Sequence, residues 1–453
     1  MTLSAILVRK REEVRLRTAG YRTTEPTIEP SDRDFEAALR TARPGFILEV
    51  KPRSPSAGRI RDVVDLGPVI DCYRRRADAV SVLTDSVFFG GSPDLLTRIR
   101  SELPQPILAK DFIIDPAQIR DLRAAGADAI LLILAALDDR SYRACADQAR
   151  ALRMSVLTEV HDAGEMARAA SLGARLIGVN SRNLRTFKVD LAGVAALAAQ
   201  APPEALVIAE SGITGRTDVR RLAGHVDGFL IGTALMSRAD PDPFARELIY
   251  GLTKVCGLTR PEDAEAAAAA GTTHGGLVFA PSSRRLDPAR AERIRRAADL
   301  QWVGVFGGHR PDEIAALARN LELNAVQLHG GESDHDLEET RRRLPDGVAL
   351  WRAVPVNGAI PPLVGPADRW LLDGQVGGGG RPFDWGLLAG IDRPDTCIVG
   401  GGLRPDNVST VPEVGIDFFD VSSGVETSPG LKDRPLMSRF LAARRARAAR
   451  RPA

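Results

Sequence analysis

The segment PILAKDFIIDPAQIRDLRAAGADAILLIL, residues 106–134, contains the repeating unit that decides the fold. An aliphatic run that ends at Lys110 and a second run that starts at Asp128 flank a stretch rich in alanine, arginine and leucine. Short aliphatic runs are typical of buried strands, and the composition between them is typical of a helix. The segment therefore predicts a strand, a helix and the next strand of a parallel sheet.

The same unit recurs along both halves of the chain. Strand-like runs in the first half begin at residues 46, 79, 106, 128, 155, 176, 206 and 228. Those in the second half begin at residues 252, 276, 302, 324, 349, 369, 397 and 416. Eight strands on each side predict two closed parallel barrels rather than one open sheet. The expected fold class is α/β, with two fused (β/α)8 barrels of the TIM type.

The predicted barrels occupy residues 1–250 and 251–453, because the series of strands restarts near Gly251 without a Pro/Ser-rich linker. Residues 1–45 precede the first strand, and we expect an amphipathic helical extension that caps the first barrel. The basic run RRARAARRPA occupies residues 444–453. We interpret it as a solvated helix end rather than a nucleic-acid site.

The charge of the whole chain excludes some partners. Among 453 residues, 61 basic and 59 acidic side chains nearly cancel, so no long-range field favours nucleic acid or an anionic membrane. The apolar run Ala129–Leu137 is far shorter than the ~20 residues that span a bilayer. The apolar start at Leu3–Val8 is followed by basic residues, the reverse of a secretory signal. We expect a cytoplasmic monomer that acts on small molecules.

Cysteine and histidine spacing predicts neither a metal site nor a disulfide. The four cysteines lie far apart without a CxxC pair, and the six histidines do not cluster. His329, at a strand end, is a possible metal ligand, although a lone histidine in that place more often has ordinary hydrogen-bond partners. We therefore expect no metal and no other cofactor.

Polar residues end the strands of the first barrel, where the active site of a parallel barrel lies. These residues are Glu49, Lys51, Lys110, Asp111, Glu159, Asn180, Arg182, Glu210 and Ser211. Two lysines and three glutamates on one rim require pairing or a ligand, because isolated buried charges are costly. The turns ESGI and IGTALM after the last two strands supply backbone N–H groups suited to a phosphate. A sugar phosphate is the expected ligand.

Six motifs in the first half together resemble one enzyme family. EVKPRSPSAG, LAKDFIIDP, LTEVHD, GVNSRNLRTF, AESGI and GFLIGTALM occur in the order found in indole-3-glycerol-phosphate synthase, over about residues 1–248. The resemblance implies closure of carboxyphenylamino-deoxyribulose phosphate to indole-3-glycerol phosphate, with loss of carbon dioxide and water. It implies that Lys110 is the general acid, that Glu159 takes part in dehydration and that Lys51 engages the anthranilate carboxylate.

The same resemblance implies roles for the surrounding residues. Charge balance and orientation are implied for Glu49, Asn180, Glu210 and Arg182. Ser54 and Ser56 lie on a loop over the site. Phe89 and Phe112 are either apolar walls for the aromatic ring or ordinary core residues. The implied phosphate ligands are Ser211, Gly212, Gly232 and Thr233.

In the second barrel, Cys256 ends the first strand and Asp373 ends the sixth, so a thiol and a carboxyl group face one rim. A lone cysteine in an apolar strand is usually inert core, but this pair can also act as base and acid. The four glycines at 377–380 favour an active-site loop over a linker. GGGLRPDN and DVSSGVE are turns suited to a phosphate.

These segments, with VGVF, VQLHG, SSRR and SPGLKD, resemble phosphoribosylanthranilate isomerase over about residues 252–447. The resemblance implies an Amadori rearrangement in which Cys256 is the base and Asp373 the acid. The family commonly has Ser-Pro-Arg where this chain has Ser283, Arg284 and Arg285. Either arginine can face the substrate, and its position favours Arg285. The implied phosphate ligands are Gly402, Ser422, Ser423 and Gly424.

The setting of Cys256 differs from that of the other three cysteines. By strand alternation Lys254 points to the same barrel interior, and we expect its charge to favour the thiolate. Cys72 and Cys145 fall in helical stretches. Cys397 begins a strand, at the end away from the chemistry.

A synthase half followed by an isomerase half resembles the fused bacterial enzyme of tryptophan biosynthesis. We expect independent sites and free diffusion of the intermediate. One alternative is that the second barrel also accepts the related two-phosphate histidine precursor, but we expect no second glycine-rich cradle after its third and fourth strands. Another is that one barrel is a non-catalytic module, which would predict lost acids and bases.

Overall fold

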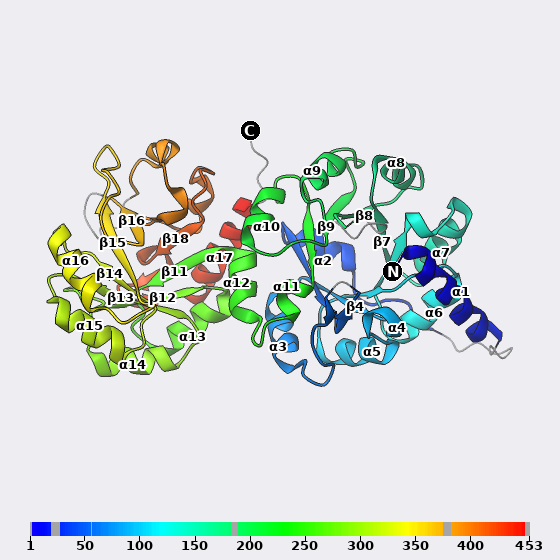
Figure 1. Ribbon diagram of the computed structural model, residues 1–453, viewed down its shortest axis with the longest axis horizontal. Helices are drawn as coiled ribbons and strands as arrows, with labels where there is room; N and C mark the ends of the chain where they lie inside the picture. The colour runs from blue at the N-terminus through cyan, green and yellow to red at the C-terminus, as the bar shows by residue number, and fades with distance from the viewer. Residues whose placement is uncertain (1, 20–27, 56, 183–188, 375–381, 449–453) are drawn as a thin grey trace. The chain divides into compact units, whose positions relative to one another are not determined.

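The computed structural model describes residues 2–19, 28–55, 57–182, 189–374 and 382–448 (Figure 1). Its first half contains a closed parallel barrel in the order β1-β10-β9-β8-β7-β6-β5-β4. The barrel strands are β1 (Gly45–Val50), β4 (Ala79–Leu83), β5 (Ile107–Lys110), β6 (Ala129–Ile133), β7 (Ser155–Val160), β8 (Leu176–Asn180), β9 (Leu206–Glu210) and β10 (Gly228–Ile231). All eight strands predicted in this half are confirmed.

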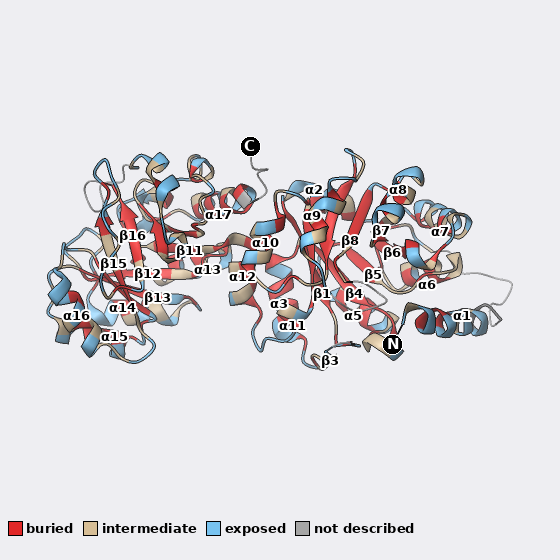
Figure 2. Cartoon of the chain, turned by 45° about the horizontal axis from the view of Figure 1, so that its top comes forward, coloured by how far each residue is buried: buried red, intermediate tan, exposed pale blue. Residues whose placement is uncertain are grey.

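Helices surround this barrel. They are α3 (Gly67–Arg76), α4 (Ser86–Phe89), α5 (Pro93–Glu102), α6 (Pro116–Ala124), η1 (Leu134–Ala136), α7 (Asp139–Ala151), α8 (Ala163–Ser171), α9 (Ala192–Ala198), α10 (Arg216–Leu222), α11 (Thr233–Met236) and α12 (Asp242–Tyr250). A small hairpin, β2 (Arg53–Ser54) with β3 (Gly58–Arg59), follows β1. Figure 2 shows buried strands at the centre and exposed outer helix faces.

The second half contains another closed parallel barrel, whose strands follow one another in chain order. They are β11 (Leu252–Cys256), β12 (His274–Val278), β13 (Gln301–Phe306), β14 (Ala325–Leu328), β15 (Ala349–Pro355), β16 (Arg369–Asp373), β17 (Cys397–Val399) and β18 (Phe418–Val421). All eight predicted strands are again confirmed. The chain divides into two compact units, and the second of them is formed by residues 246–447.

The second barrel departs from the expected alternation of strands and helices. Its helices are α13 (Pro261–Ala270), α14 (Pro288–Arg296), α15 (Pro311–Asn320), α16 (Asp334–Arg343) and α17 (Arg434–Ala448). Within the described residues, β15 is followed by an irregular segment, and β16 and β17 are followed only by short 3-10 turns. These turns are η2 (Trp385–Gly390), η3 (Pro394–Thr396) and η4 (Val408–Thr410); η5 (Ser423–Val425) and the hairpin β19 (Glu426–Ser428) with β20 (Leu431–Lys432) follow β18. Prolines 355, 361, 362 and 366 explain the missing helix after β15, because proline disrupts a helix interior.

The N-terminal extension is not a single cap. It forms α1 (Leu3–Ala19) and α2 (Phe35–Thr41), which contact different ends of the first barrel. Phe35 and Leu39 of α2 are buried and pack against the residues that begin the strands. Lys10 of α1 instead pairs with Asp111, which follows β5 at the carboxyl rim (2.9 Å). The helix α1 is only weakly amphipathic, since Val8 and Leu16 are exposed.

The basic run near the end of the chain is not solvated in its described part, contrary to the sequence prediction. Arg444 and Arg447 of α17 are buried. The Arg444 guanidinium lies 3.0 Å from Asp417 and stacks 3.9 Å from the centre of the Phe419 ring. Arg447 donates to the carbonyl oxygen of Val411 (3.1 Å). These arginines anchor α17 to the second barrel, because carbonyl and carboxylate acceptors near the start of β18 compensate their charge.

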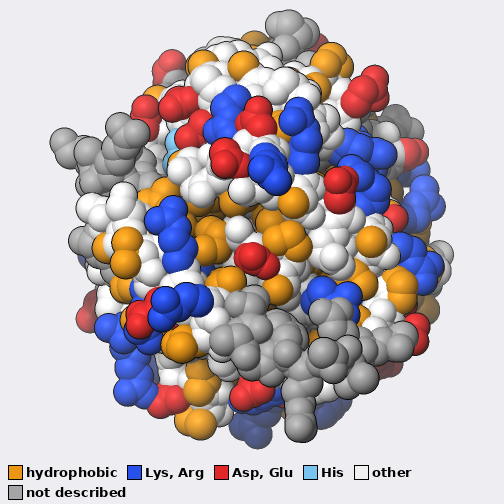
Figure 3. Space-filling view, turned by 90° about the vertical axis from the view of Figure 1, so that its right-hand side faces the viewer, with side chains coloured by type: hydrophobic (Ala, Val, Ile, Leu, Met, Phe, Trp, Pro, Cys, Tyr) orange, Lys and Arg blue, Asp and Glu red, His pale blue; other side chains and the backbone are white. Residues whose placement is uncertain are grey.

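The surface of the chain carries mixed charges. In Figure 3, basic and acidic side chains are interspersed on the face shown. Among the described residues, no helix combines the length and the hydropathy required to cross a membrane.

Candidate active sites

A cavity of about 570 Å³ opens at the carboxyl rim of the first barrel. Many of the residues expected at the first site line it. They are Glu49, Lys51, Ser54, Phe89, Lys110, Phe112, Glu159, Asn180, Arg182, Ser211, Gly212, Gly232 and Thr233. Ser56, which was expected beside Ser54, lies outside the described residues. The cavity is therefore built from strand ends and loops far apart in the sequence.

Two lysine–carboxylate pairs organise the charge of this cavity. The Lys110 ammonium lies 2.6 Å from Oε2 of Glu210, and the Lys51 ammonium lies 3.0 Å from Oε1 of Glu49. Burial alone would lower the pKa of Lys110, but the Glu210, Glu49 and Glu159 carboxylates outweigh it and raise that pKa. Lys110 is therefore a protonated donor at neutral pH.

Glu210 supports the cavity without lining it. Its side chain is fully buried, and one of its carboxylate oxygens accepts a hydrogen bond from the Lys110 ammonium. Gly178 of β8 makes this possible, because a Cβ at that position would lie 1.9 Å from Oε1 of Glu210. The glycine is thus needed for close approach of the carboxylate.

Glu159 is held by an amide and an imidazole. Asn180 donates to its Oε1 (3.1 Å), and Nε2 of His161 lies 3.2 Å from the same oxygen. The other ring nitrogen of His161 lies 3.1 Å from Glu165. Burial opposes the charge of this imidazole, but the two glutamates raise its pKa to about 10. Burial likewise opposes ionisation of Glu159, but His161, Lys110 and Asn180 lower its pKa below the ordinary value.

His161 was not among the site residues predicted from the sequence, although the motif LTEVHD contains it. His161 lies two positions after Glu159, which is the period that places two side chains on the same side of an extended chain. That spacing was the available signal.

An apolar wall completes the cavity. The rings of Phe89 and Phe112 lie 6.0 Å apart in a tilted arrangement. Leu3 and Ile6 of α1 also line the cavity. An aromatic ligand would therefore meet carbon on one side and the lysine–carboxylate pairs on the other.

The turn after β9 has the backbone expected of an anion cradle. Ser211 has φ 66° and Gly212 has φ 74°, so two consecutive residues occupy the left-handed region. For serine this conformation is uncommon and costs energy unless its surroundings support it. Ser181 supports it by donating to the Ser211 carbonyl oxygen (2.9 Å). Gly232 and Thr233 complete this side of the cavity.

A cavity of about 190 Å³ lies at the carboxyl rim of the second barrel. Cys256 and Asp373 both line it, from β11 and β16. Asp373 is largely buried, and its Oδ1 accepts a hydrogen bond from the Gly374 amide (2.8 Å). The glycines at 377–380, expected to form a loop of this site, lie outside the described residues.

Lys254 lies inside the second barrel, as alternation along β11 predicted. It is fully buried and donates to Gln327 (2.9 Å) and Asp420 (3.0 Å). A Cβ on Gly276 of the neighbouring strand would lie within 3.0 Å of both Lys254 and Cys256. Burial raises the pKa of the Cys256 thiol and outweighs the opposing charge of Lys254. The expectation of a favoured thiolate is therefore not met.

The two adjacent arginines differ in their surroundings. Arg284 lines the second cavity and forms a two-point ion pair with Glu426 (2.9 and 2.6 Å). Arg285 was favoured by its sequence position as the arginine that faces the substrate. It is exposed and does not line the cavity. Its side chain makes no ion pair with any described residue, so its charge is free for a ligand at the mouth.

The turns after β17 and β18 close the second cavity. Gly402, Ser422 and Ser423 line it, whereas Gly424 packs against the Leu403 carbonyl and does not. Lys432, which was not predicted from the sequence, is buried, and its ammonium donates to the Cys256 carbonyl oxygen (2.6 Å). It is contributed by the hairpin after β18, so this contact could not be anticipated from local spacing.

The other cysteines are buried, whereas Cys256 is partly exposed. Burial raises the pKa of Cys72 and Cys145 to about 12 and that of Cys397 to about 11. In the part of the chain that the structure describes, no three histidine, cysteine or acidic side chains gather where a metal ion could bind.

Residues 3–248 match the family model of indole-3-glycerol phosphate synthase, and residues 253–443 match that of N-(5'-phosphoribosyl)anthranilate isomerase. The chain belongs to both families. It is similar to Tryptophan biosynthesis protein TrpCF of Salmonella typhi, with 44% identity over 413 residues that cover 91% of each chain. The protein of that name from Vibrio parahaemolyticus is 43% identical over 420 residues, covering 91% of this chain and 87% of the relative. The synthase barrel and the isomerase barrel are thus fused as in these relatives.

The isomerase barrel differs from the sequence prediction in its glycine turns. Glycine pairs do follow its third and fourth strands, at 307–308 after β13 and at 330–331 after β14. One amide of each pair is already used, because Glu332 accepts hydrogen bonds from Gly308 (3.3 Å) and Gly330 (2.8 Å). A carboxylate of the chain itself therefore sits where a second phosphate would need donors.

Proposed function

We propose that the isomerase barrel converts N-(5'-phosphoribosyl)anthranilate to carboxyphenylamino-deoxyribulose 5-phosphate. The synthase barrel then closes that product to indole-3-glycerol phosphate. The observation that carries this proposal is the synthase cavity, which joins a protonated buried lysine, an apolar aromatic wall and an anion-binding turn. A ligand with an aromatic ring, a carbonyl group and a phosphate requires these three features.

In the synthase barrel, Lys110 donates a proton to the carbonyl oxygen as the aromatic carbon attacks the carbonyl carbon. Carbon dioxide leaves from the ring carbon, and water leaves in the following step. The ionised Glu159 takes the proton in that dehydration, supported by His161 and Asn180. Lys51 engages the anthranilate carboxylate and Glu49 holds Lys51 in place.

Binding groups surround this chemistry. Arg182 lines the cavity next to Asn180, whose side-chain oxygen accepts from the Arg182 amide (2.9 Å). We assign the phosphate to Ser211, Gly212, Gly232 and Thr233. Phe89 and Phe112 form the wall for the ring.

In the isomerase barrel, Asp373 donates a proton to the ribose ring oxygen, and the ring opens to a protonated imine. Cys256 removes the proton from carbon two as a thiolate, and the resulting enolamine rearranges to the ketone. Because burial raises the thiol pKa, the thiolate is a minor species before substrate binds. We assign the phosphate to Gly402, Ser422 and Ser423, and Gly424 to the support of that turn.

We assign the anthranilate carboxylate in this barrel to Arg285 rather than Arg284. Glu426 already neutralises Arg284, whereas Arg285 is exposed and unpaired among the described residues. Arg285→Ala should raise KM for phosphoribosylanthranilate roughly 10-fold or more, as expected for loss of a charged contact. Arg284→Ala should instead lower thermal stability, because it leaves Glu426 with one partner fewer. The reverse pattern would reassign the carboxylate to Arg284.

One assay tests both activities. Purified chain is given phosphoribosylanthranilate, and loss of its fluorescence and formation of indole-3-glycerol phosphate are followed together. We expect both signals, with the ketone intermediate appearing free in solution if the two sites are independent. Formation of only the intermediate would identify the first barrel as a non-catalytic module.

The two-phosphate histidine precursor fits the isomerase barrel poorly, because Glu332 occupies the glycine turns after β13 and β14. We further propose that the chain acts as a cytoplasmic monomer. Each cavity takes its groups from one barrel of one chain, and the relatives are bacterial proteins of tryptophan biosynthesis. Sedimentation of the active enzyme would test the oligomeric state.

A further inference from the structure

One ring nitrogen of His329 has no hydrogen-bond partner among the described residues. His329 follows β14 and lines the isomerase cavity beside Asp373. Its Nε2 atom is buried without a hydrogen-bond partner among the described residues, and Oδ2 of Asp373 lies 3.6 Å away. That separation is too long for a hydrogen bond. A buried polar atom left unpaired beside a proposed acid requires an explanation.

The hydrogen bonds behind His329 determine which ring nitrogen carries its proton. The Lys254 ammonium can only donate, so the atom of Gln327 that it contacts at 2.9 Å must be the amide oxygen. The amide nitrogen of Gln327 then donates to Nδ1 of His329, at 3.2 Å. Because Nδ1 accepts, the proton of the ring lies on Nε2.

The chain of contacts therefore begins at the lysine beside the proposed base and ends at the proposed acid. Lys254 lies in the barrel interior, two positions before Cys256. Its ammonium also donates to Asp420, at 3.0 Å. Gln327 is buried, so water does not compete for its amide. The contacts from Lys254 through Gln327 to His329 leave the Nε2–H group of His329 as a donor on the side of the Asp373 carboxyl group.

We propose that Gln327 and His329 are positioning residues of the isomerase reaction, a role that rests on the acid–base assignment of Asp373 and Cys256 above. Lys254 orients Gln327, and Gln327 selects the tautomer of His329. When Asp373 gives its proton to the ring oxygen of the substrate, a carboxylate forms. The Nε2–H group then closes the 3.6 Å gap and stabilises that charge.

This geometry favours the transition state over the ground state. A donor held slightly too far from a neutral acid stabilises it little before the reaction. The same donor stabilises the transition state most, because negative charge develops on the acid there. Loss of the donor should therefore lower kcat and leave substrate binding nearly unchanged. A residue that only filled space would show no such split.

The test compares variants of the full chain in the isomerase assay. His329→Ala should lower kcat roughly 10- to 100-fold, as for a hydrogen bond to a charged group, with KM within about twofold. His329→Gln should recover part of the rate, because its amide can present a donor. Gln327→Met should lower kcat by a similar factor, since the tautomer is no longer selected.

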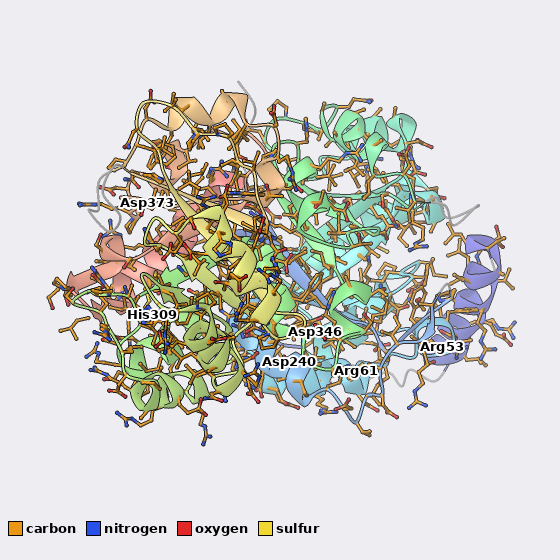
Figure 4. All side chains as sticks on the ribbon, turned by 60° about the vertical axis from the view of Figure 1, so that its left-hand side comes forward. Arg53, Arg61, Asp240, His309, Asp346 and Asp373 are labelled. Carbon is orange, nitrogen blue, oxygen red and sulfur yellow. The ribbon has the colours of Figure 1, made fainter. Side chains whose placement is uncertain are left out.

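The control is His309→Ala. His309 does not line the cavity, and Figure 4 shows it well separated from Asp373. The isomerase kcat of His309→Ala should stay at the wild-type value. Ring closure by the synthase barrel is measured on every variant as a second control.

The double variant distinguishes a chain of contacts from two unrelated losses. If Gln327 acts only through His329, Gln327→Met with His329→Ala should be no slower than His329→Ala alone. Additive losses, or unchanged kcat in His329→Ala, would overturn the proposal. Cys256→Ala and Asp373→Asn are measured in parallel. If these two retain activity, the acid–base assignment fails; if only His329→Ala retains it, the assignment stands and the positioning role fails.

Discussion

The ammonium nitrogen of Lys110 lies 2.6 Å from Oε2 of Glu210, on strands β5 and β9 of one barrel. The carboxylate is fully buried, so water does not compensate Glu210 if Lys110 is removed. Every substitution of Lys110 therefore affects the charge of Glu210 as well as the chemistry of the cavity.

Lys110→Ala should abolish ring closure and spare the isomerase. Loss of a general acid typically costs about 100- to 10,000-fold in rate. Purified variant given phosphoribosylanthranilate should accumulate the ketone intermediate at the wild-type isomerase rate. Near-normal closure would mean that the acid is another residue, with Lys51 the first candidate.

Iodoacetamide should inactivate the isomerase selectively. Cys256 is the partly exposed cysteine, whereas Cys72, Cys145 and Cys397 are buried. Because burial raises the Cys256 pKa, the reaction should be slow at neutral pH and accelerate as pH rises. A phosphoribosylanthranilate analogue should protect. Cys256→Ala should reproduce the loss and leave ring closure unchanged; a fully active Cys256→Ala isomerase would return this residue to the core.

His161→Asn should change the pH dependence of stability in the synthase barrel. The pKa of His161 is raised from 6.5 to about 10 in the folded protein. Its contribution is therefore fully present below pH ~6.5 and is lost as pH rises towards 10. The variant should be less stable at pH 6 by an amount on the order of a few kcal/mol, and the gap should close near pH 10.

The measurement of His161→Asn needs a signal from the synthase barrel. The four tryptophans, at 302, 351, 370 and 385, all lie in the isomerase barrel. Urea unfolding followed by circular dichroism reports both barrels, and tryptophan fluorescence reports the isomerase barrel alone. A gap that is independent of pH would show that His161 is neutral in the folded protein.

The fragments 1–250 and 251–453 should each catalyse one step. The second fragment lacks Arg246, which donates to the carbonyl oxygens of Asp299 (2.7 Å) and Thr272 (3.2 Å). A fragment starting at residue 242 should therefore be more stable than 251–453 by about 1–3 kcal/mol. Urea midpoints from tryptophan fluorescence would measure the difference. Complete inactivity of a soluble, folded fragment would contradict separate sites.

The strands were predictable because their signal is local. The run that ends at Lys110 is aliphatic along its whole length, as a strand buried on both faces must be. Parallel strands in a barrel end at one rim, so convergence of Lys110, Glu159 and Asn180 followed from strand ends alone. The segment after β15 breaks the repeat, because prolines 355, 361, 362 and 366 disfavour a helix there.

Contacts between distant segments were not predictable from spacing. Whether Glu210 lines the cavity or lies beneath it depends on Gly178 of the adjacent strand. Lys432 reaches the Cys256 carbonyl from 176 residues away. His161, by contrast, lies two residues from Glu159, so strand alternation alone was sufficient to predict its place at the site.

The Glu332 carboxylate occupies amide donors in the isomerase barrel that an anionic ligand could otherwise use. This carboxylate is tethered beside the Gly308 and Gly330 amides, so its effective concentration there is set by a short chain and typically reaches the millimolar range. We therefore expect Glu332 to compete with a second phosphate group for the Gly308 and Gly330 amides, which disfavours a doubly phosphorylated sugar.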